Sequence, residues 1–269
     1  MIMEKKYTAS FFRETWPEWK KKKDPLIAQF FYRPLSFYIS SFCANRGISA
    51  NSVSYFSILV ALGCCLCYVF ANHKLHIIGA LLVNLWLLLD CVDGNIARSI
   101  RKQPFGKFAD AASSLFLISF LYLSISFAVY YEGGLVVEKS NVMIIVLAAV
   151  GVVSDSFMRL LYHQFKKGQE ELLRNSDRFE EKKMELQSGD GNMPNMKERI
   201  LEALGIGGYL PLIILLCTLL KTADLVIFYI LIINVTKCII VTFKSLSNAI
   251  KMTKEFERRE RKDIMAYEL

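Results

Sequence analysis

Three aspartates stand where two long apolar segments approach each other along the chain. Asp90 and Asp93 follow the run IIGALLVNLWLLL, and Asp110 comes directly before the run AASSLFLISFLYL. A carboxylate beside the hydrocarbon of a bilayer costs free energy, and such residues usually belong to a functional site. Carboxylate oxygens suit a hard cation such as Mg2+ or Mn2+, which can bridge to a diphosphate. The residue types therefore indicate metal-assisted phosphoryl transfer.

The spacing of the first two aspartates places them on one side of a helix. If the helix continues to Arg98, then Asp90, Asp93 and Ala97 share a face. Gly94 lies beside that face. Glycine and alanine remove side-chain bulk, so a ligand or a neighbouring helix can approach the backbone there.

The next segment repeats this arrangement with steps of four residues. Gly106, Asp110 and Ser114 share a face of the following helix, and the short connection 99–105 brings the two faces together. We therefore expect the three carboxylates to converge on one pocket. The alternative is a structural role, in which charges near helix ends form caps, pair with arginine or extend to water. Three aspartates at this spacing favour the pocket.

Apolar and charged residues occupy separate parts of the chain. The 269 residues are 54% hydrophobic and 22% charged, with the apolar residues in long blocks and the charges between them. This pattern is typical of a polytopic membrane protein, whose spanning helices need about 20 apolar residues each. We therefore predict an all-α membrane protein with six transmembrane helices. The expected spans are residues 53–71, 75–98, 106–130, 141–164, 207–222 and 224–245, of which the fifth is the shortest.

The remaining segments differ from the spans in composition. In chain order we expect a polar cytoplasmic leader at 1–23, an amphipathic interfacial helix at 24–47, the six-helix domain at 48–246 and a cytoplasmic tail at 247–269. The interfacial helix has apolar and aromatic residues at helical spacing and is expected to bend near Pro34. A charged cytoplasmic insertion at 166–206 interrupts the domain. It is expected to begin as a helix and to continue as a flexible loop at GDGNMP.

Basic residues alternate between the connections. They gather in the N-terminal segment, in every second connection and in the tail, whereas each of the other connections has one lysine: 71–75, 131–140 and 221–224. By the positive-inside rule, both termini and the acidic cluster face the cytoplasm. We interpret the net charge of +8 as attraction to anionic lipid headgroups, worth about 1 kcal/mol per basic residue. Nucleic acid is excluded as a partner because no recognition motif accompanies the charge.

The seven cysteines add no chemistry of their own. Six of them lie in or beside apolar segments, and none forms the doubled CxxC pattern of a zinc site. We expect no disulfides and no zinc.

The acidic cluster resembles the signature of a known family. The pattern D-x2-D-G-x2-A-R-x7-G-x3-D, from Asp90 to Asp110, is similar to that of the CDP-alcohol phosphotransferases, also called CDP-alcohol phosphatidyltransferases. The segment Arg33-Pro34 and the later run NRGISANSVS resemble the surface helix of that family and the start of its first span. The similarity covers about 25–165, and 207–246 only by architecture.

The resemblance implies a fold and an activity. It implies a six-helix bundle, usually a homodimer, with a metal-dependent site on the cytoplasmic side. A CDP-linked donor such as CDP-diacylglycerol loses CMP, and the substituted phosphoryl group passes to an alcohol acceptor. This chemistry belongs to phospholipid or related glycolipid biosynthesis, and the expected location is the cytoplasmic membrane of a prokaryote. The lipid could be the donor or the acceptor, and the compact bundle favours a lipid donor. The alternative is a catalytically impaired relative that binds CDP nucleotides or acts as a membrane scaffold.

The resemblance also assigns roles to residues. The implied ligands of Mg2+ or Mn2+ are Asp90, Asp93 and Asp110. The implied nucleotide pocket contains Asn51, Asp93, Gly94, Ala97, Arg98 and Gly106. The catalytic positions are Asp93, Asp110 and Ser114.

Ser114 departs from the family pattern. The pattern continues G-x3-D-x3-D, and its last aspartate is a metal ligand and the proposed general base, whereas this chain has serine there. Losing a general base typically costs about 10²–10⁴-fold in rate. Three explanations stay open: the acceptor needs no strong base, His163 or Asp155 supplies one, or the chain is impaired.

The fourth expected span contains two opposite charges. Asp155 and Arg159 are four residues apart and share a helix face. Family members with polar acceptors often have an arginine in this region, so the pair is a candidate acceptor site. The alternative is a local ion pair that only lowers the cost of burial.

Overall fold

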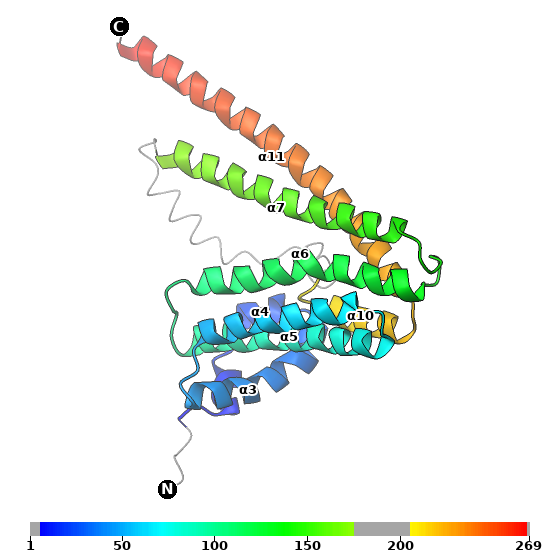
Figure 1. Cartoon of the computed structure of the whole chain (residues 1–269). Coiled ribbons are helices and arrows are strands. Elements are labelled where there is room, and N and C mark those ends of the chain that lie inside the picture. Colours follow the sequence, from blue (N-terminus) through cyan, green and yellow to red (C-terminus); the bar gives the residue numbers. More distant parts are fainter. Residues whose placement is uncertain (1–5, 175–204, 268–269) are drawn as a thin grey trace. The chain divides into compact units, whose positions relative to one another are not determined.

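Helices make up the regular structure of the protein. The computed structural model describes residues 6–174 and 205–267, and within these ranges the regular elements are helices, with no strand (Figure 1). Five of them are long and apolar enough to cross a membrane: α4 (Ala50–Val69), α5 (His73–Ser99), α6 (Gly106–Glu132), α7 (Met143–Arg174) and α11 (Ala223–Tyr267). The predicted class, an all-α integral membrane protein, is thereby confirmed.

The expected fifth span corresponds to a shorter helix. Helix α10 (Leu210–Leu219) contains 10 residues, which extend about 15 Å at the usual rise of a helix. The hydrocarbon core of a bilayer is about 30 Å thick. The segment 207–222 is therefore apolar and partly helical, and the count of six spans stays a prediction.

The chain divides into two compact units. The first comprises Met1–Ala149 and Asn192–Tyr229, and the second comprises Val150–Gly191 and Ile230–Leu269. Helices α7 and α11 each begin in the first unit and continue into the second. The expected domain boundaries stay predictions, and the GDGNMP loop lies outside the described residues.

Helix α4 packs against both α5 and α6 in the first unit. Gly79 of α5 permits part of this packing, because a Cβ atom there would lie 3.0 Å from the ring of Tyr68 and 3.2 Å from the carbonyl oxygen of Cys64. Small residues let helix backbones approach closely in membrane bundles. This contact fixes α5, which carries two of the three signature aspartates.

The described part of the expected leader is folded rather than merely polar. It contains two short helices, α1 (Ala9–Glu14) and α2 (Glu18–Lys23). Phe12 is 1% exposed, and the ring of Trp16 lies 5.8 Å from the ring of Phe37. Aromatic side chains bury large apolar areas, so a few of them anchor this charged segment.

The expected interfacial helix begins with a π-helical turn. The turn η1 (Ala28–Tyr32) leads directly into α3 (Arg33–Asn45), with Pro34 in the first turn of α3. Pro34 therefore lies inside a continuous helical segment, and the π-helical turn shifts the backbone hydrogen-bond register beside the residue that has no N–H. Burial raises the pKa of Tyr32 to about 12, so its phenol keeps its proton. The phenol donates a hydrogen bond to the side-chain carbonyl oxygen of Asn84 on α5.

The outward face of η1 and α3 is aromatic, while the inward face is polar. Figure 1 shows α3 beside α5. The exposed side chains include Phe30, Phe31, Tyr38 and Phe42, and the buried ones include Arg33, Ser36 and Ser40. A helix with an exposed apolar face and a bundle-facing polar face fits the lipid interface. This pattern supports the predicted surface position.

Within the second unit, α7 and α11 approach closely. A Cβ atom on Gly151 would lie 3.4 Å from the Cα atom of Leu231, and Asn234 donates a hydrogen bond of 3.2 Å to the carbonyl of Gly151. The glycine thus permits a backbone contact, and the amide satisfies a buried polar group.

The loop between α6 and α7 is tied to the start of α11. The Asp224 carboxylate is fully buried and accepts hydrogen bonds from the backbone N–H groups of Leu135, Val136 and Val137, at 3.0, 2.7 and 3.2 Å. Gly134 lies against the same carboxylate. This contact fixes the end of α6 remote from Asp110.

Candidate active site

The signature residues lie on two helices joined by a short hairpin. Helix α5 continues to Ser99, so Asp90, Asp93 and Ala97 do share a face, and α6 begins at Gly106. The residue before it, Phe105, has a left-handed backbone with φ of 58°. This local turn reverses the chain so that both helix ends meet at the hairpin.

The three aspartates lie close enough for their charges to interact. The Asp90 charge acts on Asp93, and the Asp110 charge acts on both. Asp93 is 8% exposed, Asp90 is partly exposed and Asp110 is exposed. The three residues that the sequence predicted as metal ligands thus lie in one region of the structure, and their role as ligands stays a prediction. Exposure of the three carboxylates therefore increases from Asp93 through Asp90 to Asp110.

A serine from a third helix holds the buried aspartate. Ser54 of α4 donates a hydrogen bond of 2.6 Å to Asp93, and both side chains are buried. Bonds to an ionised acceptor are short and strong. The sequence analysis missed this contact, although position 54 belongs to the run NRGISANSVS that carried the family resemblance.

Asn51 connects the start of α4 to the hairpin. Its side-chain amide donates to the carbonyl of Pro104 at 2.9 Å, and its backbone N–H donates to Gln103 at 3.2 Å. A Cβ atom on Gly106 would lie 3.5 Å from the Asn51 amide oxygen, an ordinary contact. Asn51 and Gly106, both expected near the nucleotide, are therefore neighbours. Gln103 had no role in the sequence analysis.

Gly94 makes room for the arginine of its own helix. A Cβ atom at Gly94 would lie 2.7 Å from the Arg98 Nη2 atom. Arg98 also donates a weak hydrogen bond of 3.4 Å to Asn95, while its Nε atom is buried without a hydrogen-bond partner among the described residues. The sequence analysis expected a carboxylate or phosphate partner for Arg98. The buried Nε–H is a donor to which an anion could bind.

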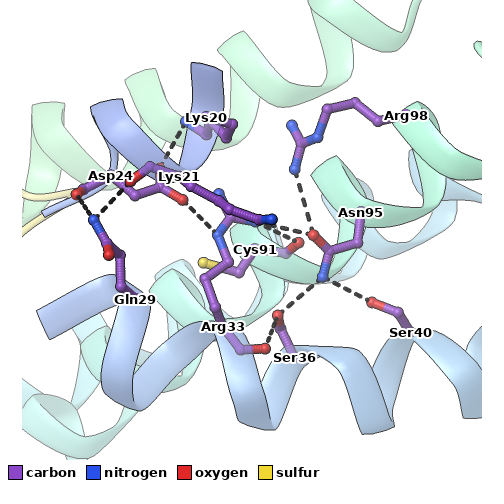
Figure 2. A network of polar contacts seen from close by, with 10 residues as sticks. All are labelled: Lys20, Lys21, Asp24, Gln29, Arg33, Ser36, Ser40, Cys91, Asn95 and Arg98. Carbon is purple, nitrogen blue, oxygen red and sulfur yellow. Dashed lines mark hydrogen bonds and ion pairs between the residues drawn. The ribbon is translucent and has the colours of Figure 1, made fainter. Parts of the chain in front are cut away.

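A polar network beside the aspartates joins the surface helices to α5. Figure 2 shows Arg33 at its centre, donating to Asp24 at 2.7 Å and to Asn95 at 3.0 Å. Lys20 also pairs with Asp24, at 3.0 Å. Asn95 in turn donates to Ser36 at 2.9 Å. The positive charge of Arg33 acts on Asp90, so this network contributes to the field of the site.

Sequence reasoning could have identified only part of this network. In the sequence, Arg33 belongs to the Arg33-Pro34 segment that resembles the surface helix of the family. Asn95 occupies a variable position of the signature. A buried arginine needs a carboxylate and further acceptors, which the network supplies. No pattern in the sequence around Asp24, the carboxylate partner of Arg33, predicts that it is buried.

The two serines that follow Asp110 differ in their surroundings. Ser113 is buried, accepts a hydrogen bond of 2.8 Å from the Trp86 indole and bonds to Ser57 of α4. Ser114 is partly exposed and lies one turn from Asp110. Ser113 therefore belongs to the packing of the bundle, whereas Ser114 is the hydroxyl on the helix face that Asp110 shares.

The candidate acceptor residues lie in the second unit. Arg159 binds Asp155 through its Nε atom at 2.6 Å and its Nη2 atom at 3.3 Å. Asp155 is buried, whereas Arg159 and His163 are exposed. The local ion pair is thus present, and a role in acceptor binding stays a prediction.

The fold is that of an integral membrane protein, with the three signature aspartates on the two helices that flank the hairpin 99–105. Residues 48–171 match the family model of the CDP-alcohol phosphatidyltransferases. The match includes α4, α5 and α6 and most of α7, and so the whole segment from Asp90 to Ser114. No curated protein matches the sequence. Members of the family use CDP-linked donors and alcohol acceptors and are generally dependent on a divalent metal.

Proposed function

We propose that the protein is an active CDP-alcohol phosphotransferase of the phospholipid or glycolipid pathways. It transfers a substituted phosphoryl group from a CDP-linked donor, such as CDP-diacylglycerol, to an alcohol and releases CMP. The observation that supports this proposal best is that Asp90, Asp93 and Asp110 lie near enough for their charges to interact, within the residues that match the family model. Three interacting carboxylates beside a membrane are unfavourable unless a cation offsets their repulsion.

The residues present fit a divalent metal. In the proposal Asp90, Asp93 and Asp110 hold Mg2+ or Mn2+, because all their donor atoms are carboxylate oxygens. When bound, the ion neutralises the diphosphate and stabilises the leaving group. The hydrogen bond from Ser54 to Asp93 orients one carboxylate, as outer-shell partners of metal ligands usually do.

The neighbouring residues fit the nucleotide end of the donor. Arg98 has an unpartnered buried Nε–H among the described residues, which in the proposal donates to a phosphate oxygen. Asn51 and Gly106 lie side by side at the hairpin and would border the cytidine. Gly94 and Ala97 add little bulk on the shared face of α5, so the nucleotide can approach the backbone.

In the proposal the acceptor alcohol is activated without the fourth aspartate of the family. Asp110 is the exposed carboxylate of the three and can take the proton of an incoming hydroxyl. Ser114, one turn further on, can orient that hydroxyl by a hydrogen bond but cannot serve as a base by itself. Asp155 is less suited to the base role because Arg159 already neutralises it.

The proposal includes the setting of the enzyme. The distribution of basic residues favours a site and termini on the cytoplasmic side, and the resemblance favours a homodimer. The aromatic outward face of η1 and α3 would lie at the lipid interface near the site, where a lipid substrate enters from the membrane.

The experiment measures CMP release by the purified full-length protein. The protein is incubated with Mg2+ or Mn2+, a panel of CDP-linked donors and a panel of alcohols, and Asp93→Asn serves as the inactive control. We expect CMP release with at least one pair and loss of release when a chelator removes the metal. Tight CDP binding without release for any pair would contradict the proposal and support a nucleotide-binding scaffold. Lipid mass spectrometry of cells with and without the protein would then identify the alcohol.

A further inference from the structure

A second cluster of potential ligands lies at the other ends of α5 and α6. His73 and His76 stand in the first turn of α5, and Glu132 is the last residue of α6. The potential ligand atoms of the three side chains all lie within 4.8 Å of one another. His76 is buried, and the other two are partly exposed. On α5, His76 and Asp93 are 17 residues apart, which is about 25 Å at the usual rise.

The geometry of His76 leaves a lone pair facing a carboxylate. Its Nε2 atom lies 2.7 Å from the carbonyl oxygen of Phe70, which can only accept, so Nε2 carries the hydrogen. In the neutral ring the other nitrogen, Nδ1, then has a lone pair. That atom lies 2.6 Å from Glu132 Oε1, yet Oε1 is buried without a hydrogen-bond partner among the described residues. Two acceptor atoms therefore face each other, an arrangement that a shared cation would stabilise.

The remaining contacts orient the same three side chains. His73 Nδ1 lies 2.8 Å from Glu132 Oε2. The ring of Tyr68 stacks on the ring of His76, with centroids 5.8 Å apart and planes at 13°. A ligating histidine usually donates its other N–H to a carbonyl or a carboxylate, which fixes its tautomer and its orientation. Phe70 provides that acceptor for His76.

We propose that His73, His76 and Glu132 form a transition-metal site that binds Zn2+. Two imidazole nitrogens and one carboxylate, with water as a fourth ligand, are a known tetrahedral zinc set. Imidazole suits zinc better than it suits Mg2+, so this site differs in chemistry from the aspartate cluster. The site would hold the start of α5 against the end of α6.

The space around the cluster fits a single ion. A cavity of about 10 Å³ lies there, lined by all three side chains and also by Lys221, and this is about the volume that one water needs. Tetrahedral ligands about 2.0 Å from zinc lie roughly 3.3 Å apart, so Glu132 needs to shift by less than about 1 Å. Lys221 opposes a cation here, and the carboxylate offsets its charge.

This site was not visible in the sequence. The cysteines do not form a doubled CxxC pattern, and for that reason no zinc was expected. His73 and His76 are three residues apart, but Glu132 is 56 residues beyond His76. Only the packing of α4 against both α5 and α6 brings the third ligand to the histidines.

The test measures zinc binding by the full-length protein in detergent. The protein is first stripped with a chelator, and excess Mg2+ is then added to occupy carboxylate-only sites. We expect one equivalent of Zn2+ to bind, a higher melting temperature on binding, and the intense visible bands of a tetrahedral site with Co2+. His73→Ala and the isosteric Glu132→Gln should each lower the zinc affinity by at least about 100-fold, more than loss of an outer-shell partner.

His163→Ala is the matched control, because His163 is an exposed histidine of the second unit and its loss should leave zinc binding unchanged. Absence of stoichiometric binding, or wild-type affinity in both variants, would overturn the proposal. If a variant loses its helical circular dichroism, X-ray absorption of the zinc-loaded wild type decides. Scattering from two imidazoles supports the site, and a shell of oxygen alone refutes it. CMP release is not a readout, so this test is independent of the proposed phosphotransferase activity.

Discussion

Each aspartate of the cluster has a different environment. Asp93 is buried and bonded to Ser54, whereas Asp110 is exposed. A buried carboxylate with an oriented hydrogen bond is suited to hold an ion, and an exposed one is suited to meet a second substrate. Two predictions follow from the side chains around these aspartates.

The first prediction concerns Ser54→Ala. Removing the hydroxyl leaves Asp93 without the donor that orients it, so the metal affinity should fall about 10–100-fold. CMP release measured against Mg2+ or Mn2+ concentration gives this shift. Ser54→Thr keeps a hydroxyl, so it should retain the affinity. Equal metal dependence in Ser54→Ala and wild type would contradict an outer-shell role.

The second prediction concerns Ser114→Asp. A carboxylate here would lie one turn from Asp110 and restore the family pattern, so it should strengthen metal binding and shift the metal dependence of CMP release. Restoring a general base should raise the turnover rate by up to about 10²–10⁴-fold, the typical contribution of such a group. Ser113→Ala tests the neighbouring position. Because it removes buried hydrogen bonds to Trp86 and Ser57, it should lower the stability of the protein rather than change its metal dependence. If Ser114→Asp changes neither metal affinity nor turnover, Ser114 lies outside the pocket.

At the scale of elements, the helices are positioned by buried polar contacts as well as by apolar packing. Arg33 links the surface helices to α5 through Asp24 and Asn95, and Asp224 links the start of α11 to the loop after α6. Buried charges are tolerated only with well-placed partners. Substitutions at the Asp224 contact should therefore lower stability without touching the aspartate cluster.

The third prediction compares Gly134→Ala with Gly168→Ala. A Cβ atom on Gly134 would clash with the Asp224 carboxyl group, whereas nothing lies within 4 Å of the corresponding position at Gly168. Gly134→Ala should therefore destabilise by about 1–3 kcal/mol, as overpacking usually does. Gly168→Ala, inside α7, should be neutral or stabilising by about 0.5–1 kcal/mol. Thermal unfolding in detergent measures both. An unchanged melting temperature for Gly134→Ala would contradict the close contact with Asp224.

At the scale of the molecule, the number of spans determines where the termini lie. In the part of the chain that the structure describes, five helices are long enough to cross, and α10 is shorter. Six spans place both termini on one side of the membrane, whereas five place them on opposite sides. The alternation of basic connections favours six and a cytoplasmic location for both ends.

The fourth prediction concerns this topology. Tags fused to the N-terminus and to the C-terminus should both be accessible only from the cytoplasmic side, as measured by tag labelling in sealed vesicles of each orientation. A tag placed in the 131–140 connection serves as the control, because it should be accessible from the opposite side. Termini on opposite sides would refute the six-span prediction.

The amino-acid sequence was sufficient to predict the membrane class and the long helices, and it supplied the candidate site residues, which stay predictions. The reason is that long apolar blocks form helices in lipid, where every backbone polar group needs an internal partner, and a step of three or four residues defines a helix face. The shared face of Asp90 and Asp93 follows from this spacing alone, because α5 continues through both residues.

Tertiary structure decided the partners of these residues. Ser54 meets Asp93, Arg33 meets Asp24 and Asn95, and Glu132 meets two histidines, although no spacing along the chain connects them. The folded leader was missed for a similar reason, since Phe12 and Trp16 gain their burial from α3 rather than from a local pattern. Periodicity reports which way a side chain points from its own helix, and only packing determines what lies opposite.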